Sequence, residues 1–287
     1  MPKTRLRDDP IWGVLYFMAL NYPAKIIEFK DIARVCGYRD FIKSIMVLHP
    51  DEQFKKCLKH HVQGYHRAMR TDVNNESIFS SRQNMCKFVY DVECACKWGS
   101  RVSRETPTLL SRCAVFEKFR AKSDTREGHL KSMDHSFNAR HWSPNGFVPL
   151  HWGAYYWILL YRMAQVPIST IEQLNSWVLL LLHALGEVLP CGKCRRRYVH
   201  RNKSQIVSPL LGAAAAQAAR RVHDQSETLI PCNTMIRIIY KLHARVRKET
   251  KGDTLFQLEK LWEVLQNDVK HMSTWNLLFL QKYCIIT

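Results

Sequence analysis

Two cysteines spaced for redox chemistry lie in the segment Pro190-Cys191-Gly192-Lys193-Cys194. The segment follows a Leu-rich run and precedes three consecutive arginines, so we expect the pair at the first turn of a helix. There the helix dipole and nearby cations lower a thiol pKa from ~8.5 into roughly the 3.5–7.5 range. A thiolate of that kind is the nucleophile of thiol–disulfide exchange. The sequence therefore predicts a redox-active dithiol.

Three other interpretations of this pair remain open. Cys191 and Cys194 could be half of a zinc site completed by Cys94 and Cys96, although no second CxxC or His-x3-His element stands at the usual spacing. A thioredoxin-like site is disfavoured because that motif follows a buried strand, whereas a long helix is expected here. The third interpretation is that the two cysteines are ordinary buried core residues. It fits a pair placed between a proline and three arginines poorly, and it fits Cys36, Cys57, Cys86 and Cys113 better.

The elements that must position the dithiol are predicted to be helices, because helical periodicity dominates and strand alternation is rare. Ser169, with Glu172 three residues later, indicates the start of a largely buried helix that ends just before Pro190. Residues 99–148 are polar and broken by Pro and Gly, which indicates a connector with one helix over about 109–122. Further helices are expected over 149–163, 191–202, 209–221, 234–251 and 253–271.

An internal echo relates the two halves of the chain at an offset of 140 residues. Trp12-Gly13 recurs as Trp152-Gly153, and Pro50 recurs as Pro190. Asp51 and Phe54 occupy the two cysteine positions in the first copy, which therefore lacks the dithiol; a weaker match, which needs ten inserted residues in the second copy, aligns Tyr90 with Tyr240. We predict a degenerate helical domain over 1–98, a connector over 99–148, a catalytic domain over 149–252 and a helical extension over 253–287.

Composition limits the possible partners. The 287 residues contain 43 Lys and Arg against 25 Asp and Glu, a net charge of +18, which raises nucleic acid as a partner. We do not expect one, because the basic residues are spread along the chain without a recognised reading module. No apolar run reaches the ~20 residues of a membrane span. With Asp8 and Asp9 near the start, we expect an intracellular protein without a signal peptide.

Taken together, these motifs resemble the Erv/ALR family of sulfhydryl oxidases over about residues 149–252. The family carries W-G-x-x-x-W-x-x-L-H, then P-C-x-x-C, then H-N-x-V-N. This chain has Trp152-Gly-Ala-Tyr-Tyr-Trp157-Ile-Leu-Leu-Tyr161, then the Cys191/Cys194 segment, then His243-Ala-Arg-Val-Arg247. Tyr161 stands where the family has His, and Ala244 and Arg247 replace both Asn residues.

The resemblance implies an FAD-dependent thiol oxidase with the cofactor inside a four-helix bundle. Cys191 would exchange with a protein dithiol substrate and Cys194 would reduce the flavin, which passes the electrons to oxygen and gives hydrogen peroxide. The residues implied to line the cofactor are Trp152, Trp157, Tyr161, Cys194, Tyr198, His243, Val246 and Arg247. Lys248 and Lys251 are implied to reach its phosphates.

Other expectations follow from the same resemblance. Family bundles pair through their first helices, so the degenerate half is expected to replace a partner in an intramolecular pseudo-dimer, with a homodimer also possible. Members without a leader are typical of large DNA viruses, which implies the host cytoplasm or nucleus, or the virion. Shuttle cysteines could be Cys94, Cys96 or Cys284. The alternative function is a basic nucleic-acid-binding helical protein with zinc at the CxxC; a purely structural protein would leave the dithiol unexplained.

Overall fold

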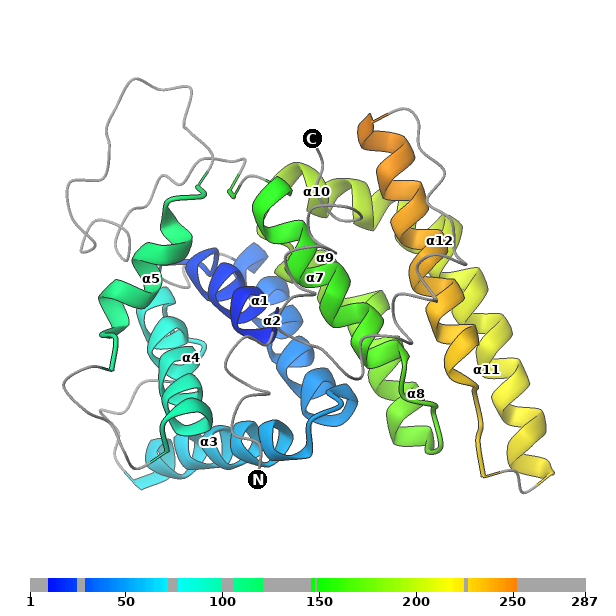
Figure 1. The fold of residues 1–287 in the computed structure, drawn as a ribbon, viewed down its shortest axis with the longest axis horizontal. Helices are drawn as coiled ribbons and strands as arrows, with labels where there is room; N and C mark the ends of the chain where they lie inside the picture. Colours follow the sequence, from blue (N-terminus) through cyan, green and yellow to red (C-terminus); the bar gives the residue numbers. More distant parts are fainter. Residues whose placement is uncertain are drawn as a thin grey trace.

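The computed structural model describes residues 10–24, 29–71, 77–99, 106–120, 146–147, 149–224 and 227–251. Within these ranges the chain forms helices and two isolated bridges, one between Arg120 and Phe147 and one between Ile168 and Ile230, and no strand (Figure 1). The predicted all-α class is confirmed for this part of the chain. None of the described helices has both the length and the apolar character needed to cross a membrane. The expected helix over 253–271 and Cys284 lie outside the described residues.

The first half is built around one apolar helix. All 11 residues of α1 (Pro10–Leu20) are buried, as expected for a helix that is apolar on every side. It is surrounded by α4, α5 and α7. The other described helices of this half are α2 (Phe29–Leu48), α3 (Glu52–Thr71), α4 (Arg82–Lys97) and α5 (Leu109–Glu117).

The predicted connector contributes to the core. Thr108 caps α5 by accepting a hydrogen bond from the backbone N–H of Ser111 at 3.2 Å. Phe116 stacks on Tyr16 of α1 with ring centroids 5.0 Å apart, and Cys113 is fully buried. Residues 106–120 therefore pack against the first half rather than hanging between two separate cores. Apart from Gly99 and residues 146–147, the rest of the predicted connector lies outside the described residues.

The second half contains two long helical segments that include π-helical turns. One runs from α8 (Ile171–Val178) through η1 (Leu179–Ala184) to α9 (Leu185–Val188). The other runs from α10 (Gly192–Arg197) through η2 (Tyr198–Val207) to α11 (Ser208–His223). The remaining helices are α7 (Pro149–Ala164) and α12 (Cys232–Lys251), close to their predicted bounds.

Two local predictions were wrong. The helix α8 starts one residue later than expected, because Thr170 and Gln173 form the capping box and Gln173 Oε1 also accepts from the Ser169 N–H. The helices expected over 191–202 and 209–221 are one continuous segment. Pro209 has no N–H for a regular helix interior, and the π-helical bond from Ser208 N–H to Lys203 carbonyl, five residues back, accommodates it.

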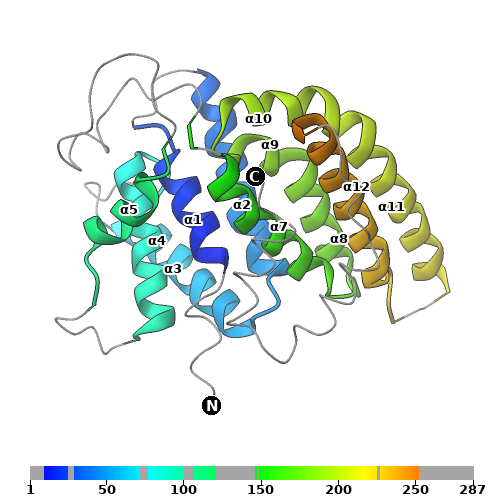
Figure 2. The same cartoon turned by 45° about the horizontal axis from the view of Figure 1, so that its top comes forward.

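The two halves pack together in an antiparallel manner. α1 lies on α7, and α2 lies along the segment from α8 to α9 (Figures 1 and 2). In the contact between α2 and the α8–α9 segment, a Cβ at Gly37 would overlap Glu187, near the end of α9. Val47, near the end of α2, lines one small cavity together with Trp177 of α8, so the two segments run in opposite directions. A Cβ at Gly13 would likewise overlap the Tyr155 ring between α1 and α7. These contacts require glycine at two points where the helices approach most closely.

The echo seen in the sequence also appears in the local structure. The Asp51 carboxylate accepts the Phe54 N–H at 2.8 Å at the start of α3, and the Cys191 sulfur accepts the Cys194 N–H at 3.2 Å at the start of α10. In the first half the Phe54 ring packs edge-on against Trp12, with centroids 5.7 Å apart. Phe54 thus fills the space beside Trp12 at the position that corresponds to Cys194.

Candidate functional site

The two cysteines of the CxxC segment form a disulfide at the start of α10. Their Cα atoms are 5.2 Å apart, and Cys191 is the N-cap residue in an extended backbone conformation. Cys191 is 4% exposed, whereas Cys194 is half-buried. The Arg195 guanidinium donates to the Leu189 carbonyl at 3.0 Å, which ties the first turn of α10 to the end of the preceding helical segment. The predicted position of the pair at a helix start is therefore confirmed.

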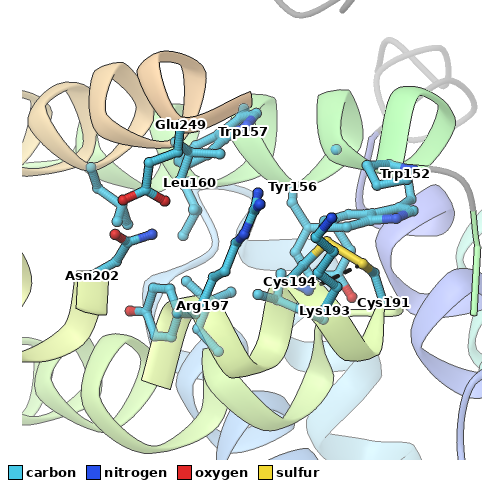
Figure 3. Close-up of a pocket in the computed structure, with 17 residues that line it drawn as sticks. Trp152, Tyr156, Trp157, Leu160, Cys191, Lys193, Cys194, Arg197, Asn202 and Glu249 are labelled. Carbon is cyan, nitrogen blue, oxygen red and sulfur yellow. Dashed lines mark hydrogen bonds between the residues drawn. A yellow bond between two sulfur atoms is a disulfide. The ribbon is translucent and has the colours of Figure 1, made fainter. Parts of the chain in front are cut away.

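The disulfide forms part of the wall of a cavity of about 370 Å³ (Figure 3). This cavity lies between α7, α12 and the segment that α10 opens, and one further side is closed by the end of the α8–α9 segment. Its walls are largely apolar and aromatic, with a few polar side chains. The lining residues are Pro149, Trp152, Gly153, Tyr156, Trp157, Leu160, Leu185, Leu189, Cys191, Lys193, Cys194, Arg197, Tyr198, Asn202, Leu242, Val246 and Glu249.

The aromatic rings of α7 are held by specific contacts. Trp152 Nε1 donates to the Phe147 carbonyl at 3.2 Å, and the Tyr156 hydroxyl donates to the Val188 carbonyl at 3.0 Å. The two rings meet edge-on, with centroids 5.3 Å apart. Because Val188 ends α9 just before the CxxC segment, the Tyr156 bond links this aromatic wall to the dithiol. The wall beside the disulfide is thus rigidly oriented.

Trp157 is backed by a buried histidine. Its ring stacks on His243 of α12, with centroids 4.1 Å apart and an interplanar angle of 13°. The Tyr161 hydroxyl lies 3.2 Å from His243 Nδ1 in a hydrogen bond. Burial, aided by the positive charge of Arg247, lowers the pKa of His243 to about 3. His243 is therefore neutral near pH 7 and positions Trp157 without adding a charge.

The structure separates the predicted cofactor residues into two groups. Cavity-lining residues among them are Trp152, Trp157, Cys194, Tyr198 and Val246. Those outside the lining are Tyr161, His243, Arg247 and the exposed Lys248. Tyr161 and His243 lie behind the Trp157 ring, so their contact with a ligand would be indirect. The Lys251 side chain lies outside the described part of the structure.

Five polar or aromatic residues of the cavity were not predicted to line it, and one of them, Lys193, lies within the CxxC segment. The other four follow at helical spacing from residues that were: Tyr156 four after Trp152, Arg197 three after Cys194, Asn202 four after Tyr198 and Glu249 three after Val246. Residues three and four apart share a helix face, so continuing each motif by one turn would have found them.

The polar side chains that line the cavity differ in charge. Lys193 and Arg197 add positive charge, and Figure 3 shows the Arg197 side chain pointing between Trp157 and the disulfide. Glu249 accepts a hydrogen bond from Arg245 Nε at 2.8 Å. Asn202 is 3% exposed, and its Oδ1 has no hydrogen-bond partner among the described residues. The Tyr198 hydroxyl donates a hydrogen bond to the Leu181 carbonyl at 2.5 Å.

The residues present fit a flavin cofactor by their chemistry. The cavity volume falls within the roughly 300–1,000 Å³ of small-molecule and cofactor sites. Flat aromatic side chains suit a planar ring system, Lys193 and Arg197 suit phosphate, and the free Asn202 oxygen can accept a ligand N–H.

Among the described residues, no group of three or more His, Cys, Asp and Glu could hold a metal ion. The chain matches no protein-family model, no curated protein and no solved structure.

Proposed function

We propose that this chain is an FAD-dependent sulfhydryl oxidase that forms disulfides in protein substrates. The observation that carries the proposal is the Cys191–Cys194 disulfide in the wall of an aromatic cavity with nearby cations. A disulfide at a helix start is a good electron acceptor for thiols, since the helix dipole stabilises the thiolate that leaves. The adjoining cavity offers space for the group that reoxidises it.

The thiol chemistry balances without any further group in its first stage. A substrate thiolate attacks one sulfur of the Cys191–Cys194 disulfide, which gives a mixed disulfide and releases the other sulfur as a thiolate. The second substrate thiol then attacks the mixed disulfide. The products are a substrate disulfide and the reduced pair, so two electrons and two protons have moved. FAD, when bound, supplies a two-electron acceptor that passes the electrons to oxygen and yields hydrogen peroxide.

The residues of the chain have separate tasks in this proposal. Trp152, Tyr156 and Trp157 would hold the planar part of the cofactor beside the disulfide, because their rings are fixed in the wall of the cavity. Lys193 and Arg197 would stabilise anionic groups and the thiolate of the reduced pair. Cys191 is 4% exposed and Cys194 is half-buried, so the two single-cysteine variants are needed to identify which sulfur bonds to the substrate.

The first half has a structural task in the same proposal. The antiparallel contacts of α1 with α7 and of α2 with the α8–α9 segment support an intramolecular pseudo-dimer. A covalently linked copy presents its apolar surface at high effective concentration, so no second chain is needed for this contact. With Asp51 and Phe54 in place of the cysteines, the first half keeps the helix start and lacks the chemistry.

Purification under non-denaturing conditions tests this function. We expect about one FAD per chain, a flavin absorption band, and oxygen consumption with a dithiol substrate. Cys194→Ser and Cys191→Ser should each abolish turnover, and the variant whose remaining thiol forms a mixed disulfide with the oxidised, disulfide form of the substrate retains the cysteine that bonds to substrate. Stoichiometric zinc without flavin would overturn the proposal in favour of a zinc-containing, nucleic-acid-binding protein.

A further inference from the structure

A second group of reactive side chains lies between α3 and α4, away from the cavity. Cys57 is on α3, with His61 one turn later, and Cys96 is near the end of α4. Cys57, His61 and Cys96 are all half-buried. Figures 1 and 2 show α3 and α4 at the end of the molecule opposite α11 and α12. None of the three residues lines the cavity beside the Cys191–Cys194 disulfide.

The geometry brings these groups together. Cys57 Sγ lies 3.8 Å from His61 Nδ1 and 4.0 Å from the Val92 carbonyl oxygen. Val92 is one turn before Cys96, and helical side chains lean toward the preceding turn, so the Cys96 thiol reaches the same place. The Cys57 and Cys96 side chains lie close enough for each to change the pKa of the other. His61 Nδ1 also lies 3.0 Å from the Cys57 carbonyl oxygen, and that acceptor favours a proton on this nitrogen.

The electrostatics make the two cysteines different. The hydrogen bond from Cys96, together with His61 and His60, outweighs burial and lowers the pKa of Cys57 to about 5. The same hydrogen bond raises the pKa of Cys96, with burial adding to the effect. Cys57 and, more weakly, Asp91 raise the pKa of His61. Of the two cysteines, Cys57 therefore has the lower pKa and is the one that loses its proton first.

We propose that Cys57 and Cys96 are a second redox-active dithiol that reacts with disulfides, Cys57 as the attacking sulfur and Cys96 as the resolving sulfur. The Cys57 thiolate attacks a disulfide RSSR, which forms a Cys57–SR mixed disulfide and releases RS⁻. Cys96 then attacks Cys57, which forms a Cys57–Cys96 disulfide and releases RSH. Two electrons pass from the cysteines to RSSR, and the proton of Cys96 leaves with the second thiol. This reaction joins α3 to α4 and does not depend on the proposed oxidase function.

The first test identifies the products. The full chain carrying Cys191→Ser and Cys194→Ser is reduced, freed of reductant and treated with glutathione disulfide without oxygen, so that the CxxC takes no part. Peptide mass spectrometry should find a Cys57–Cys96 disulfide. When Cys96→Ser is added, glutathione should stay attached to Cys57. Loss of both products, or glutathione retained on Cys57 while Cys96 is present, would overturn the proposal.

The second test measures the rate of attack at pH 6. A thiol of pKa about 5 is mostly thiolate there, about 300-fold more than one of pKa ~8.5, while its lower intrinsic nucleophilicity offsets roughly 40-fold of this. Cys57 should thus react about tenfold faster than an ordinary cysteine of a model peptide, and faster than the half-buried Cys36 and Cys232 in the same molecule. When the rate is followed as a function of pH, His61→Gln should raise the pH at which the Cys57 rate is half-maximal, whereas His60→Gln, which alters an exposed side chain, should raise it less. Equal rates for the three cysteines, or equal effects of the two histidine variants, would contradict this assignment.

Discussion

Trp157 and His243 stack face to face across the contact between α7 and α12, with ring centroids 4.1 Å apart. The two residues are 86 positions apart in the chain, and of the two only Trp157 lines the cavity. His243 is 2% exposed and Trp157 is half-buried, so the histidine supports a ring that faces the cavity. The stack therefore connects the stability of the fold with the shape of the site.

The buried His243 predicts a loss of stability in acid. Its folded-state pKa is about 3, below the ~6.5 of an exposed histidine, so the unfolded state binds this proton more readily. Stability linked to His243 is complete above about pH 6.5 and is lost as the pH falls toward 3. Between pH 7 and pH 5 the free energy of unfolding should fall by roughly 2 kcal/mol less in His243→Gln than in the unchanged protein. Urea unfolding at both pH values measures this difference, and identical pH dependence in the two proteins would contradict it.

The Trp157 ring is predicted to contribute to cofactor binding. Trp157→Leu removes the flat surface of the cavity wall and should reduce the flavin retained after purification by tenfold or more, equivalent to about 1.4 kcal/mol of binding. Trp98→Leu is the matched control, because Trp98 is also half-buried but lies at the end of α4 and does not line the cavity. Absorbance of flavin relative to protein measures both variants. Equal flavin content would show that Trp157 does not contact the cofactor.

The contact between the two halves predicts opposite effects for two glycine substitutions. A Cβ at Gly37 would overlap Glu187, so Gly37→Ala should lower the free energy of unfolding by about 1–3 kcal/mol. A Cβ at Gly64 meets nothing within 4 Å, and Gly64→Ala should stabilise α3 by roughly 0.5–1 kcal/mol. Chemical denaturation of both variants tests the packing of α2 on α9. Equal stabilisation by both would mean that α2 and α9 are not in close contact.

Glu93 is predicted to be the most sensitive charged residue of the first half. Its buried carboxylate accepts from Tyr16 at 2.7 Å, Lys97 at 2.6 Å and Arg112 at 2.6 Å, which joins α1, α4 and α5. Glu93→Ala leaves two cations without this partner and should cost about 3–5 kcal/mol. Glu52→Ala, which breaks a surface pair with Lys55, should cost less than about 1 kcal/mol. Chemical denaturation midpoints compare the stability of the two variants. A loss of less than about 1 kcal/mol for Glu93→Ala would mean that this hydrogen-bond network is not formed in solution.

Several features could be predicted because they depend on residues close together in the chain. Helix periodicity predicted α7 and α12, and the Pro-Cys-x-x-Cys-Arg pattern predicted a dithiol at a helix start. The choice between neighbouring caps was harder, since Ser169 and Thr170 both carry a hydroxyl group. Only the position of the Gln173 amide, which reaches both backbone N–H groups, decided it.

Contacts between distant segments could not be predicted from the sequence. Cys57 and Cys96 are 39 residues apart, and the earlier interpretation of Cys57 as a core residue had no information about the packing of α3 on α4. His243 was expected to line the cofactor site because it matches the family motif. The packing of α12 on α7 instead puts it behind Trp157 and outside the cavity lining. The sequence by itself determined the helical class, the approximate bounds of α7 and α12, and the dithiol at a helix start, because hydrogen bonds within a turn involve near neighbours. Only the tertiary structure decided which side chains share a cavity or a proton, because those distances depend on how whole helices pack.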